Sequence, residues 1–120
     1  MAKIITVDDS VSVRKLVAAT LQSAGHLVAE ACDGQEGLEV TSKEAFDLVI
    51  SDLNMPVMDG LTFIKQLRQV ASYRTTPILI LTTEMDPEKK KIARASGATG
   101  WIVKPFDPAQ LLATIRKVLD

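Results

Sequence analysis

Apolar residues fall into two kinds of segment that alternate along the chain. Segments of the first kind are short, almost unbroken and rich in branched side chains, and they span residues 4–7, 27–29, 48–50, 78–81 and 101–103. Runs without polar alternation are typical of strands whose two sheet faces are both covered. Segments of the second kind are longer and carry apolar residues at helical spacing, as in Val13, Leu16, Val17 and Leu21. The same helical pattern recurs at residues 61–67 and 111–119.

Capping residues divide the chain at the same places. Asp86-Pro87 and Asp107-Pro108 each supply an acidic N-cap followed by proline at the first helical position. Asp33-Gly34 and Asp59-Gly60 open the second and third helices. Strands and helices in regular alternation favour an α/β fold, doubly wound, in which helices cover both faces of a parallel sheet. We expect one such domain over residues 1–120.

Composition and charge narrow the class of protein. The chain has a mass of 13.0 kDa, with 47% hydrophobic and 24% charged residues, which excludes a disordered polypeptide. A net charge of −1 excludes a strongly basic nucleic-acid binder and a polybasic membrane anchor. A single cysteine excludes an internal disulfide, and no apolar run approaches the roughly 20 residues that cross a bilayer. We therefore expect a soluble, cytoplasmic protein.

Polar side chains follow the predicted strands directly. In a doubly wound sheet, the ligand crevice lies beyond the carboxyl ends of the strands. If the strands are adjacent and in register, three carboxylates, a hydroxyl and an ammonium group meet there. The residues at these ends are Asp8, Asp9, Ser51, Asp52, Asn54, Thr82, Thr83, Glu84 and Lys104.

Three neighbouring carboxylates repel one another unless a cation lies between them. Carboxylate oxygens completed by water suit Mg²⁺. Acidic residues are also common at helix N-termini, which alone would explain Asp8 and Asp9. Their match with Asp52 and Lys104 at other strand ends favours the cation site. A calcium loop starting at Asp52 fails, because its fifth, sixth and twelfth positions hold Pro56, Val57 and Phe63.

The cation beside this acidic cluster suggests phosphoryl chemistry. Lys104 lies between an apolar strand and Pro105, which restricts its position. A metal ion, the Lys104 ammonium and the Thr82 hydroxyl could satisfy the three equatorial oxygens of a phosphoryl group. The chain has no glycine-rich phosphate loop, so a bound nucleotide is not expected. Covalent attachment of the phosphoryl group to a carboxylate fits better.

These motifs, in this order, resemble the receiver domain of bacterial two-component response regulators. The resemblance rests on Asp8-Asp9, Asp52 within residues 51–56, Asp59-Gly60, Thr82 and Lys104-Pro105-Phe106, and it covers essentially the whole chain. With nothing after the fifth strand–helix unit, the chain is most similar to stand-alone, CheY-like chemotaxis regulators. The resemblance implies a flavodoxin-like sheet in the order 2-1-3-4-5.

The resemblance also implies roles for the site residues. Asp52 would accept a phosphoryl group from the phosphohistidine of a sensor histidine kinase, CheA-like in chemotaxis. Asp9 would bind Mg²⁺ directly, Asp8 through water and Asn54 through its main-chain carbonyl, with Asp52 also facing the ion. Lys104 would pair with the phosphoryl oxygens, and its peptide bond to the following proline would be cis.

Two residues would carry the signal to the surface. Thr82 would move toward the phosphoryl group and leave space for Trp101, changing the surface of the fourth helix, fifth strand and fifth helix. Family members usually have Tyr or Phe in place of Trp101, so we expect a more restricted swing here. Thr83 is expected to narrow access to Asp52 and slow phosphoryl exchange, while Asn54 and Glu84 flank the site and could orient water.

The partners implied are a sensor histidine kinase and a downstream target, either the flagellar switch or another effector. A phosphatase or a histidine phosphotransfer protein could join them, and the protein would act as a monomer that catalyses only its own phosphorylation and dephosphorylation. A phosphorelay intermediate remains an alternative. An aspartate-based phosphohydrolase would need a second acidic residue at position 54, where this chain has Asn54. A flavin binder would need a phosphate-binding loop, which the chain lacks.

Outside the site, His26 is expected in a surface turn, and Cys32 as a small, half-buried residue.

Overall fold

Strands and helices alternate as the apolar pattern predicts. The computed structural model describes residues 1–120. The strands are β1 (Lys3–Val7), β2 (Leu27–Ala31), β3 (Leu48–Ser51), β4 (Ile78–Thr82) and β5 (Gly100–Val103). The helices are α1 (Val11–Ser23), α2 (Gly34–Lys43), α3 (Gly60–Arg68), α4 (Pro87–Ser96) and α5 (Pro108–Leu119), with a short 3-10 helix, η1 (Ala71–Tyr73), before β4.

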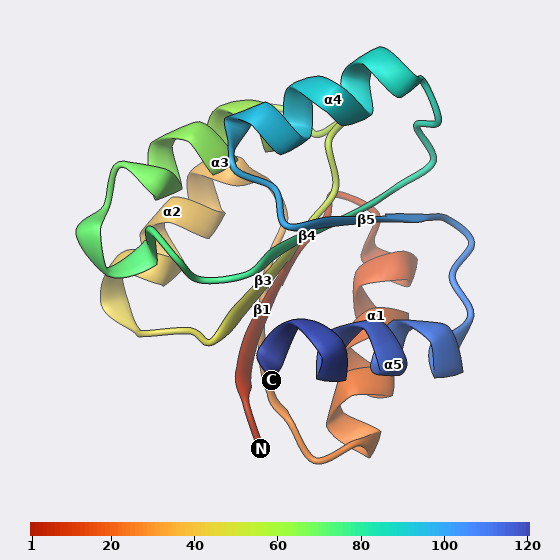
Figure 1. The fold of residues 1–120 in the computed structure, drawn as a ribbon. Coiled ribbons are helices and arrows are strands. Elements are labelled where there is room, and N and C mark those ends of the chain that lie inside the picture. The colour runs from red at the N-terminus through yellow and green to blue at the C-terminus, as the bar shows by residue number, and fades with distance from the viewer.

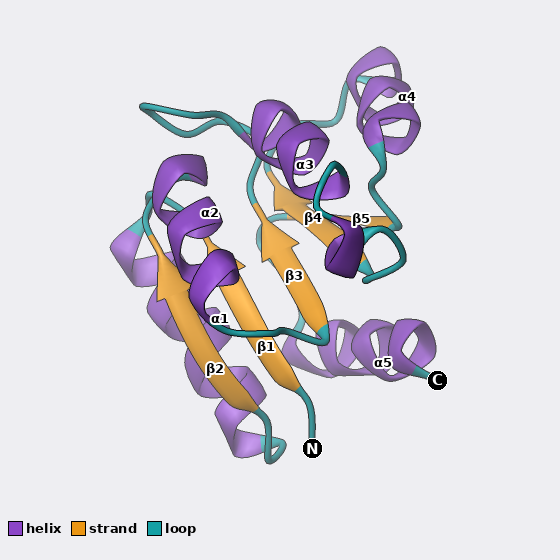
Figure 2. Ribbon diagram, turned by 90° about the vertical axis from the view of Figure 1, so that its left-hand side faces the viewer, coloured by secondary structure: helices purple, strands orange, loops and turns teal.

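The five strands form one parallel sheet in the order β2-β1-β3-β4-β5, which confirms the predicted flavodoxin-like topology. Helices α1 and α5 cover one face, and α2, α3 and α4 cover the other (Figures 1 and 2). The chain turns back between β1 and β3, so the strand order reverses beside β1. Crevices in such sheets form beyond the carboxyl ends at this point. None of the helices is long and apolar enough to span a lipid bilayer.

The unbroken apolar runs reflect two hydrophobic cores, one on each face of the sheet. In β4, Ile78 and Ile80 belong to the core under α2, α3 and α4, whereas Leu79 and Leu81 belong to the core under α1 and α5. Successive strand residues point to opposite faces, so a strand buried on both faces needs apolar residues at every position. The edge strand β2 departs from this pattern, because Leu27 is 54% exposed.

Each helix begins at a side-chain cap. The predicted caps Asp33, Asp59, Asp86 and Asp107 each accept a hydrogen bond from a main-chain N–H in the first turn of their helix. Helix α1 is capped instead by Ser10, and its first turn holds no acidic residue. The pair Asp8-Asp9 therefore lies before the helix, between it and the end of β1.

Gly60 lets the start of α3 lie against the chain that carries Asp52. Its N–H donates to the carbonyl of Leu53 at 2.8 Å. A Cβ atom built at Gly60 would lie 2.1 Å from the Asp52 carbonyl oxygen and 2.8 Å from the Cα of Leu53. Main-chain atoms cannot rotate away as a side chain can. Any larger residue must therefore displace the segment that carries Asp52.

We predict that Gly60→Ala lowers the free energy of unfolding by about 1–3 kcal/mol, the usual cost of overpacking. Gly100→Ala serves as the control, because its added Cβ would meet only the flexible end of Leu79, at 2.8 Å. Urea denaturation of both variants measures the difference. Equal stability of the two variants would contradict the close approach at Gly60.

Candidate functional site

Two buried aspartates lie side by side at the carboxyl edge of the sheet. β1 and β3 are neighbours, with Val7 opposite Ser51, so Asp8 and Asp52 occupy the next position on each strand. Asp8 is 3% exposed and Asp52 is 8% exposed. Asp9 is exposed, yet one carboxylate oxygen from each of the three residues lies within 4.8 Å of the others. The predicted convergence of three carboxylates is therefore present.

Lys104 joins the two buried carboxylates. Its Nζ atom lies 2.7 Å from Asp8 Oδ2 and 3.0 Å from Asp52 Oδ2. Its main-chain N–H donates to the carbonyl of Thr82 at 2.8 Å, which fixes the turn after β5 against the end of β4. The peptide bond between Lys104 and Pro105 is cis, as the resemblance implies.

The charges of this cluster do not balance. Burial opposes the charged form of Lys104, but its hydrogen bonds to Asp8 and Asp52 outweigh burial and raise the pKa of its ammonium above the ordinary value. Lys104 therefore stays protonated and positively charged at neutral pH. Three carboxylates and one ammonium leave an excess of two negative charges. A divalent cation would match that excess.

The side chain of Asp52 is held on two sides. Its Oδ1 atom accepts a hydrogen bond from the N–H of Leu53 at 2.7 Å, while Oδ2 faces Lys104. Its own N–H donates to the carbonyl of Val7 at 3.0 Å, and the hydroxyl of Ser51 donates to its carbonyl at 2.8 Å. These contacts fix the carboxylate in one orientation at the edge of the crevice. A fixed carboxylate beside a cation suits the role of a nucleophile.

The last residue of β4 and the residues after it lie beside the cluster but do not bind it. Thr82 is fully buried, and its hydroxyl oxygen accepts a hydrogen bond from the N–H of Glu84 at 3.3 Å. Thr83 is exposed. The Glu84 carboxylate lies 3.4 Å from the ammonium of Lys89 on α4. The β4–α4 loop therefore connects the site to α4 through an ion pair.

Asn54 and Trp101 complete the set of predicted residues. Asn54 is exposed in the loop after β3, beyond Asp52. Trp101 is half-buried on β5, lies opposite Ile80 of β4 and packs against the core under α3 and α4. Trp101 therefore packs against the core through its indole and is also a candidate switch residue.

The donor set fits Mg²⁺. The ion prefers hard oxygen ligands and keeps several waters, so two or three carboxylates at the edge of a crevice suffice. Asp9 is exposed, and its carboxylate has no hydrogen-bond partner in the protein. It is thus available as a ligand. Neither cysteine nor histidine lies in the cluster, which disfavours softer metals.

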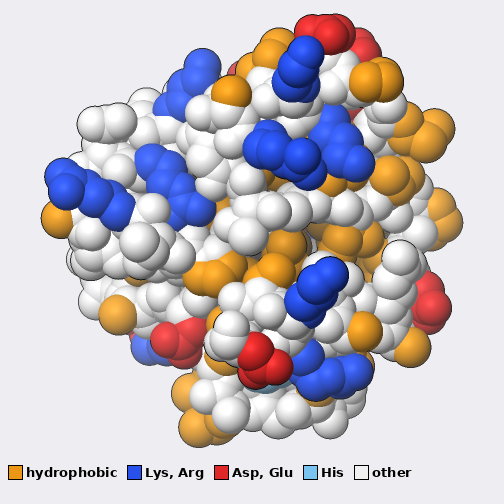
Figure 3. All heavy atoms as spheres, viewed as in Figure 1, with side chains coloured by type: hydrophobic (Ala, Val, Ile, Leu, Met, Phe, Trp, Pro, Cys, Tyr) orange, Lys and Arg blue, Asp and Glu red, His pale blue; other side chains and the backbone are white.

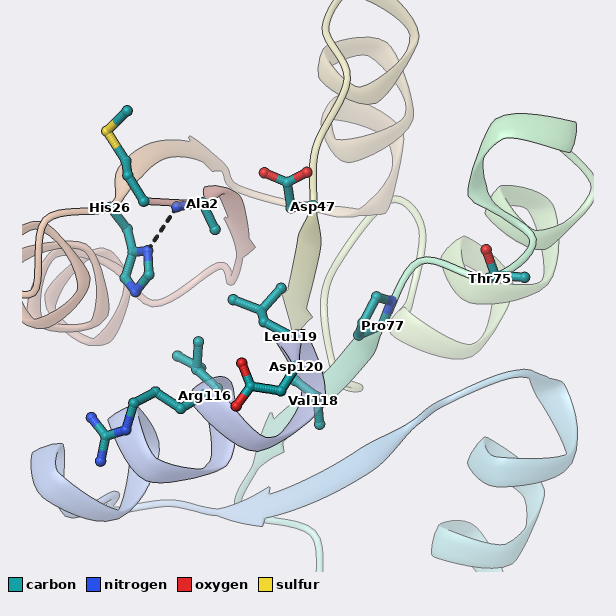
Figure 4. Close-up of a pocket in the computed structure, with 11 residues that line it drawn as sticks. Ala2, His26, Asp47, Thr75, Pro77, Arg116, Val118, Leu119 and Asp120 are labelled. Atoms are coloured by element: carbon teal, nitrogen blue, oxygen red, sulfur yellow. Dashed lines mark hydrogen bonds between the residues drawn. The ribbon is translucent and has the colours of Figure 1, made fainter.

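The largest hollow lies at the opposite end of the molecule. It has a volume of about 680 Å³ and lies between the amino ends of the strands and the end of α5. His26, Asp47, Pro77, Arg116 and Leu119 are among its lining residues (Figure 4). It contains none of the clustered carboxylates, so it is separate from the site at the carboxyl edge of the sheet.

Two predictions outside the site have different outcomes. His26 lies between the turn after α1 and the start of β2 and is half-buried, and its Nδ1 atom accepts a hydrogen bond from the N–H of Ala2 at 3.1 Å. Cys32 was expected to be half-buried, and this is wrong, since it is exposed. β2 ends one residue earlier, and Cys32 lies in the turn before α2, where its N–H donates to Glu36 at 2.8 Å.

Sequence reasoning missed one residue beside the site. Arg14 of α1 donates through Nη1 to the main-chain carbonyl of Asp8 at 2.7 Å. No motif marks this arginine. The available signal was its place in the first turns of the helix that follows Asp8-Asp9, where its side chain can reach back to the strand end.

Residues 4–116 match the response regulator receiver domain. The chain belongs to this family. Receiver domains are the phosphorylation-activated switches of two-component response regulators: they interact with a sensor histidine kinase and a downstream effector, and they typically bind Mg²⁺ through acidic residues. The aspartate cluster at the carboxyl edge of the sheet is consistent with that chemistry.

Individual relatives differ in length. The receiver domain is 37% identical to the response regulator ArlR of Staphylococcus saprophyticus, covering 99% of this chain and 53% of that protein. It is 38% identical to the probable transcriptional regulator ycf27 of Porphyridium aerugineum, covering 98% of this chain and 48% of that protein. The chain thus spans about half the length of these curated relatives.

Solved structures of similar length also match. The chemotaxis protein CheY4 of Vibrio cholerae is 54% identical with a TM-score of 0.95, and the match covers 98% of each chain. A CheY-like receiver domain protein of Methanospirillum hungatei is 26% identical with a TM-score of 0.94, covering 100% of this chain and 94% of that one.

We predict that Asp9→Asn raises the melting temperature by about 2–4 °C in the presence of EDTA, because it removes one of three repelling carboxylates. The same change should abolish the rise in melting temperature that Mg²⁺ gives the wild-type receiver domain. Calorimetry with and without Mg²⁺ measures both effects. Glu39→Gln, at an exposed carboxylate on α2, is the control and should behave as wild type. Loss of stability in Asp9→Asn under EDTA would contradict the repulsion.

Proposed function

We propose that this receiver domain switches state when Asp52 accepts a phosphoryl group from the phosphohistidine of a sensor histidine kinase. The observation that carries the proposal is the Lys104 ammonium, placed 3.0 Å from one oxygen of a buried, fixed Asp52 carboxylate. Transfer breaks the P–N bond of the phosphohistidine and forms a P–O bond to Asp52. The released imidazole nitrogen takes up a proton.

Each neighbour of Asp52 has a separate part in the proposal. Asp8, Asp9 and Asp52, with the main-chain carbonyl of Asn54, would hold Mg²⁺, which neutralises charge on the phosphoryl oxygens when bound. Lys104 would exchange its contact with Asp52 for one with a phosphoryl oxygen.

The end of β4 would sense the phosphoryl group, and the residues after it would tune how long it lasts. The buried Thr82 hydroxyl, whose partner in the unmodified protein is the N–H of Glu84, would turn toward it. Thr83 and Glu84, at the mouth of the site, would modulate how quickly it is gained and lost.

The α4-β5-α5 surface would report the change. Only Ala93 of α4 is buried, and Ile92 is 47% exposed, so a small free energy can shift this helix. Lys and Arg side chains gather over α4 (Figure 3), and Lys90 and Arg94 border Trp101. The ion pair between Glu84 and Lys89 connects the site to the same helix.

The proposed setting is chemotaxis or related two-component signalling. Its support is the match to CheY4 of Vibrio cholerae over 98% of both chains. On this proposal the protein is a stand-alone, cytoplasmic monomer that receives its phosphoryl group from a CheA-like kinase and binds the flagellar switch or another effector. A phosphatase or histidine phosphotransfer protein would be a further partner. The protein would catalyse only its own phosphorylation and dephosphorylation.

We predict that acetyl phosphate with Mg²⁺ adds the mass of one phosphoryl group to the protein, and that Asp52→Asn prevents the addition. Mass spectrometry of the intact protein measures it. Asp47→Asn, which changes an exposed aspartate at the opposite end of the sheet, should be phosphorylated as wild type. An adduct that persists in Asp52→Asn, or turnover of acetyl phosphate without an adduct, would refute the proposal.

Trp101 gives a direct probe of the switch, because it is the only tryptophan of the chain. We predict that a phosphoryl mimic such as beryllium fluoride, added with Mg²⁺, changes its fluorescence as the indole enters the space left by Thr82. Asp52→Asn should abolish the change. Unchanged emission at saturating beryllium fluoride and Mg²⁺, in protein that acetyl phosphate phosphorylates fully, would rule out Trp101 as a switch residue.

A further inference from the structure

Asp8 and Asp9 are neighbours in the chain but differ in how they are held. All four polar groups of Asp8 have partners: its N–H donates to Ala31, Oδ1 accepts from the N–H of Ser10, and Oδ2 accepts from Lys104. Its carbonyl accepts from Arg14. The Asp9 carboxylate, by contrast, is exposed and has no partner. The position of Asp9 therefore depends on its main chain.

The main chain at Asp9 is set by the carbonyl of Asp8. That carbonyl and the N–H of Asp9 belong to the same planar peptide unit, so fixing one fixes the other. Arg14 Nη1 donates to the carbonyl oxygen at 2.7 Å, a short distance for a charge-assisted hydrogen bond. The Arg14 guanidinium is the side chain that determines the plane of this peptide on its carbonyl side.

Arg14 is itself held in place. Its Nε atom donates to Glu30 Oε1 at 3.0 Å, and Lys15 donates to Glu30 Oε2 at the same distance. The Arg14 side chain is 13% exposed. Burial opposes charge on Glu30, but hydrogen bonds from Lys15 and Arg14 hold the pKa of its carboxyl below the ordinary value. The carboxylate of Glu30 on β2 thus orients the guanidinium from the side away from the site.

We propose that Arg14 is a positioning residue for the cation site: by holding the Asp8–Asp9 peptide, it directs the unpartnered Asp9 carboxylate toward Asp8 and Asp52, and Glu30 orients Arg14. This inference rests on the proposed Mg²⁺ chemistry of Asp52. It adds residues of α1 and β2, which belong to none of the recognised motifs, to the set on which the cation site depends.

Charge and positioning make opposite predictions for Arg14. A cation this near the cluster repels Mg²⁺, so if only its charge mattered, removing it would strengthen binding. If Arg14 positions Asp9, removing the Arg14 side chain weakens Mg²⁺ binding even though the repulsion between Arg14 and Mg²⁺ is lost. Lys15 offers a matched control, because it adjoins Arg14, binds the same Glu30 carboxylate and makes no hydrogen bond to Asp8.

The experiment compares wild type with Arg14→Met, Arg14→Lys and Lys15→Met. Isothermal titration calorimetry measures the dissociation constant for Mg²⁺ in the unphosphorylated protein. We expect both Arg14 variants to bind Mg²⁺ about tenfold more weakly, as when residues that orient metal ligands are lost. Lys15→Met should stay within about twofold of wild type, because it removes an exposed ion pair with Glu30 but leaves both contacts of Arg14 in place. Arg14→Lys keeps the charge but lacks the planar fork that serves Asp8 and Glu30 together.

A second measurement separates positioning from general loss of structure. The rate of phosphorylation by acetyl phosphate is followed as Mg²⁺ is increased. The Arg14 variants should need more Mg²⁺ for half-maximal rate but reach the wild-type maximum. A lowered maximum at saturating Mg²⁺ would show that Arg14 does more than position the ligand and would overturn the proposal.

The other outcomes are equally decisive. Equal or tighter Mg²⁺ binding by Arg14→Met, or full rescue by Arg14→Lys, would overturn the positioning role while leaving the function of Asp52 intact. A wild-type protein that binds no Mg²⁺ would overturn the proposed function and this inference together.

Discussion

The ammonium of Lys104 lies 2.7 Å from Asp8 Oδ2 and 3.0 Å from Asp52 Oδ2, and the rest of the site depends on this contact. Two carboxylates can be buried side by side only with a counter-charge, since an unpaired buried charge costs several kcal/mol. One ammonium suffices to hold them but does not neutralise the cluster, to which the exposed Asp9 adds a third negative charge. The remaining charge suits a divalent cation, and a phosphoryl group on Asp52 would compete for the same ammonium.

The parallel sheet brings these charges together. β1 and β3 place Asp8 and Asp52 at the same level, and the turn after β5 brings Lys104 across the end of β4. Because both faces of the sheet are packed, the strand ends are rigid supports. α4 differs, with a single buried residue, and the ion pair between Glu84 and Lys89 connects it to the site. A rigid site beside a loosely packed helix is the arrangement that a two-state switch needs.

Much of this could be predicted from the sequence. Unbroken apolar runs indicated a sheet covered on both faces, and polar residues directly after the runs indicated one crevice, because parallel strands end at the same edge. The strand order came only from the family resemblance, since apolar patterning does not say which strands are neighbours.

Three features could not be predicted, two of them because they depend on how far a side chain reaches. Lys104 contacts Asp8 as well as Asp52, Arg14 donates a hydrogen bond to the carbonyl of Asp8, and Cys32 is exposed in the turn after β2. The first brings together residues distant in the chain, and the second depends on the Arg14 side chain reaching back from α1 to the end of β1. The third lies in the turn between β2 and α2, beyond the apolar run, where the apolar pattern does not indicate whether a side chain is exposed.

Phosphorylation at Asp52 is proposed to change the α4-β5-α5 surface. Amide hydrogen exchange, measured on unmodified and fully phosphorylated protein, tests it most directly, because exchange reports local opening of each helix and strand. We expect altered protection in α4 and β5, with β1, β3 and α2 unchanged. Identical exchange in α4 and β5, in protein whose mass shows complete phosphorylation, would contradict it.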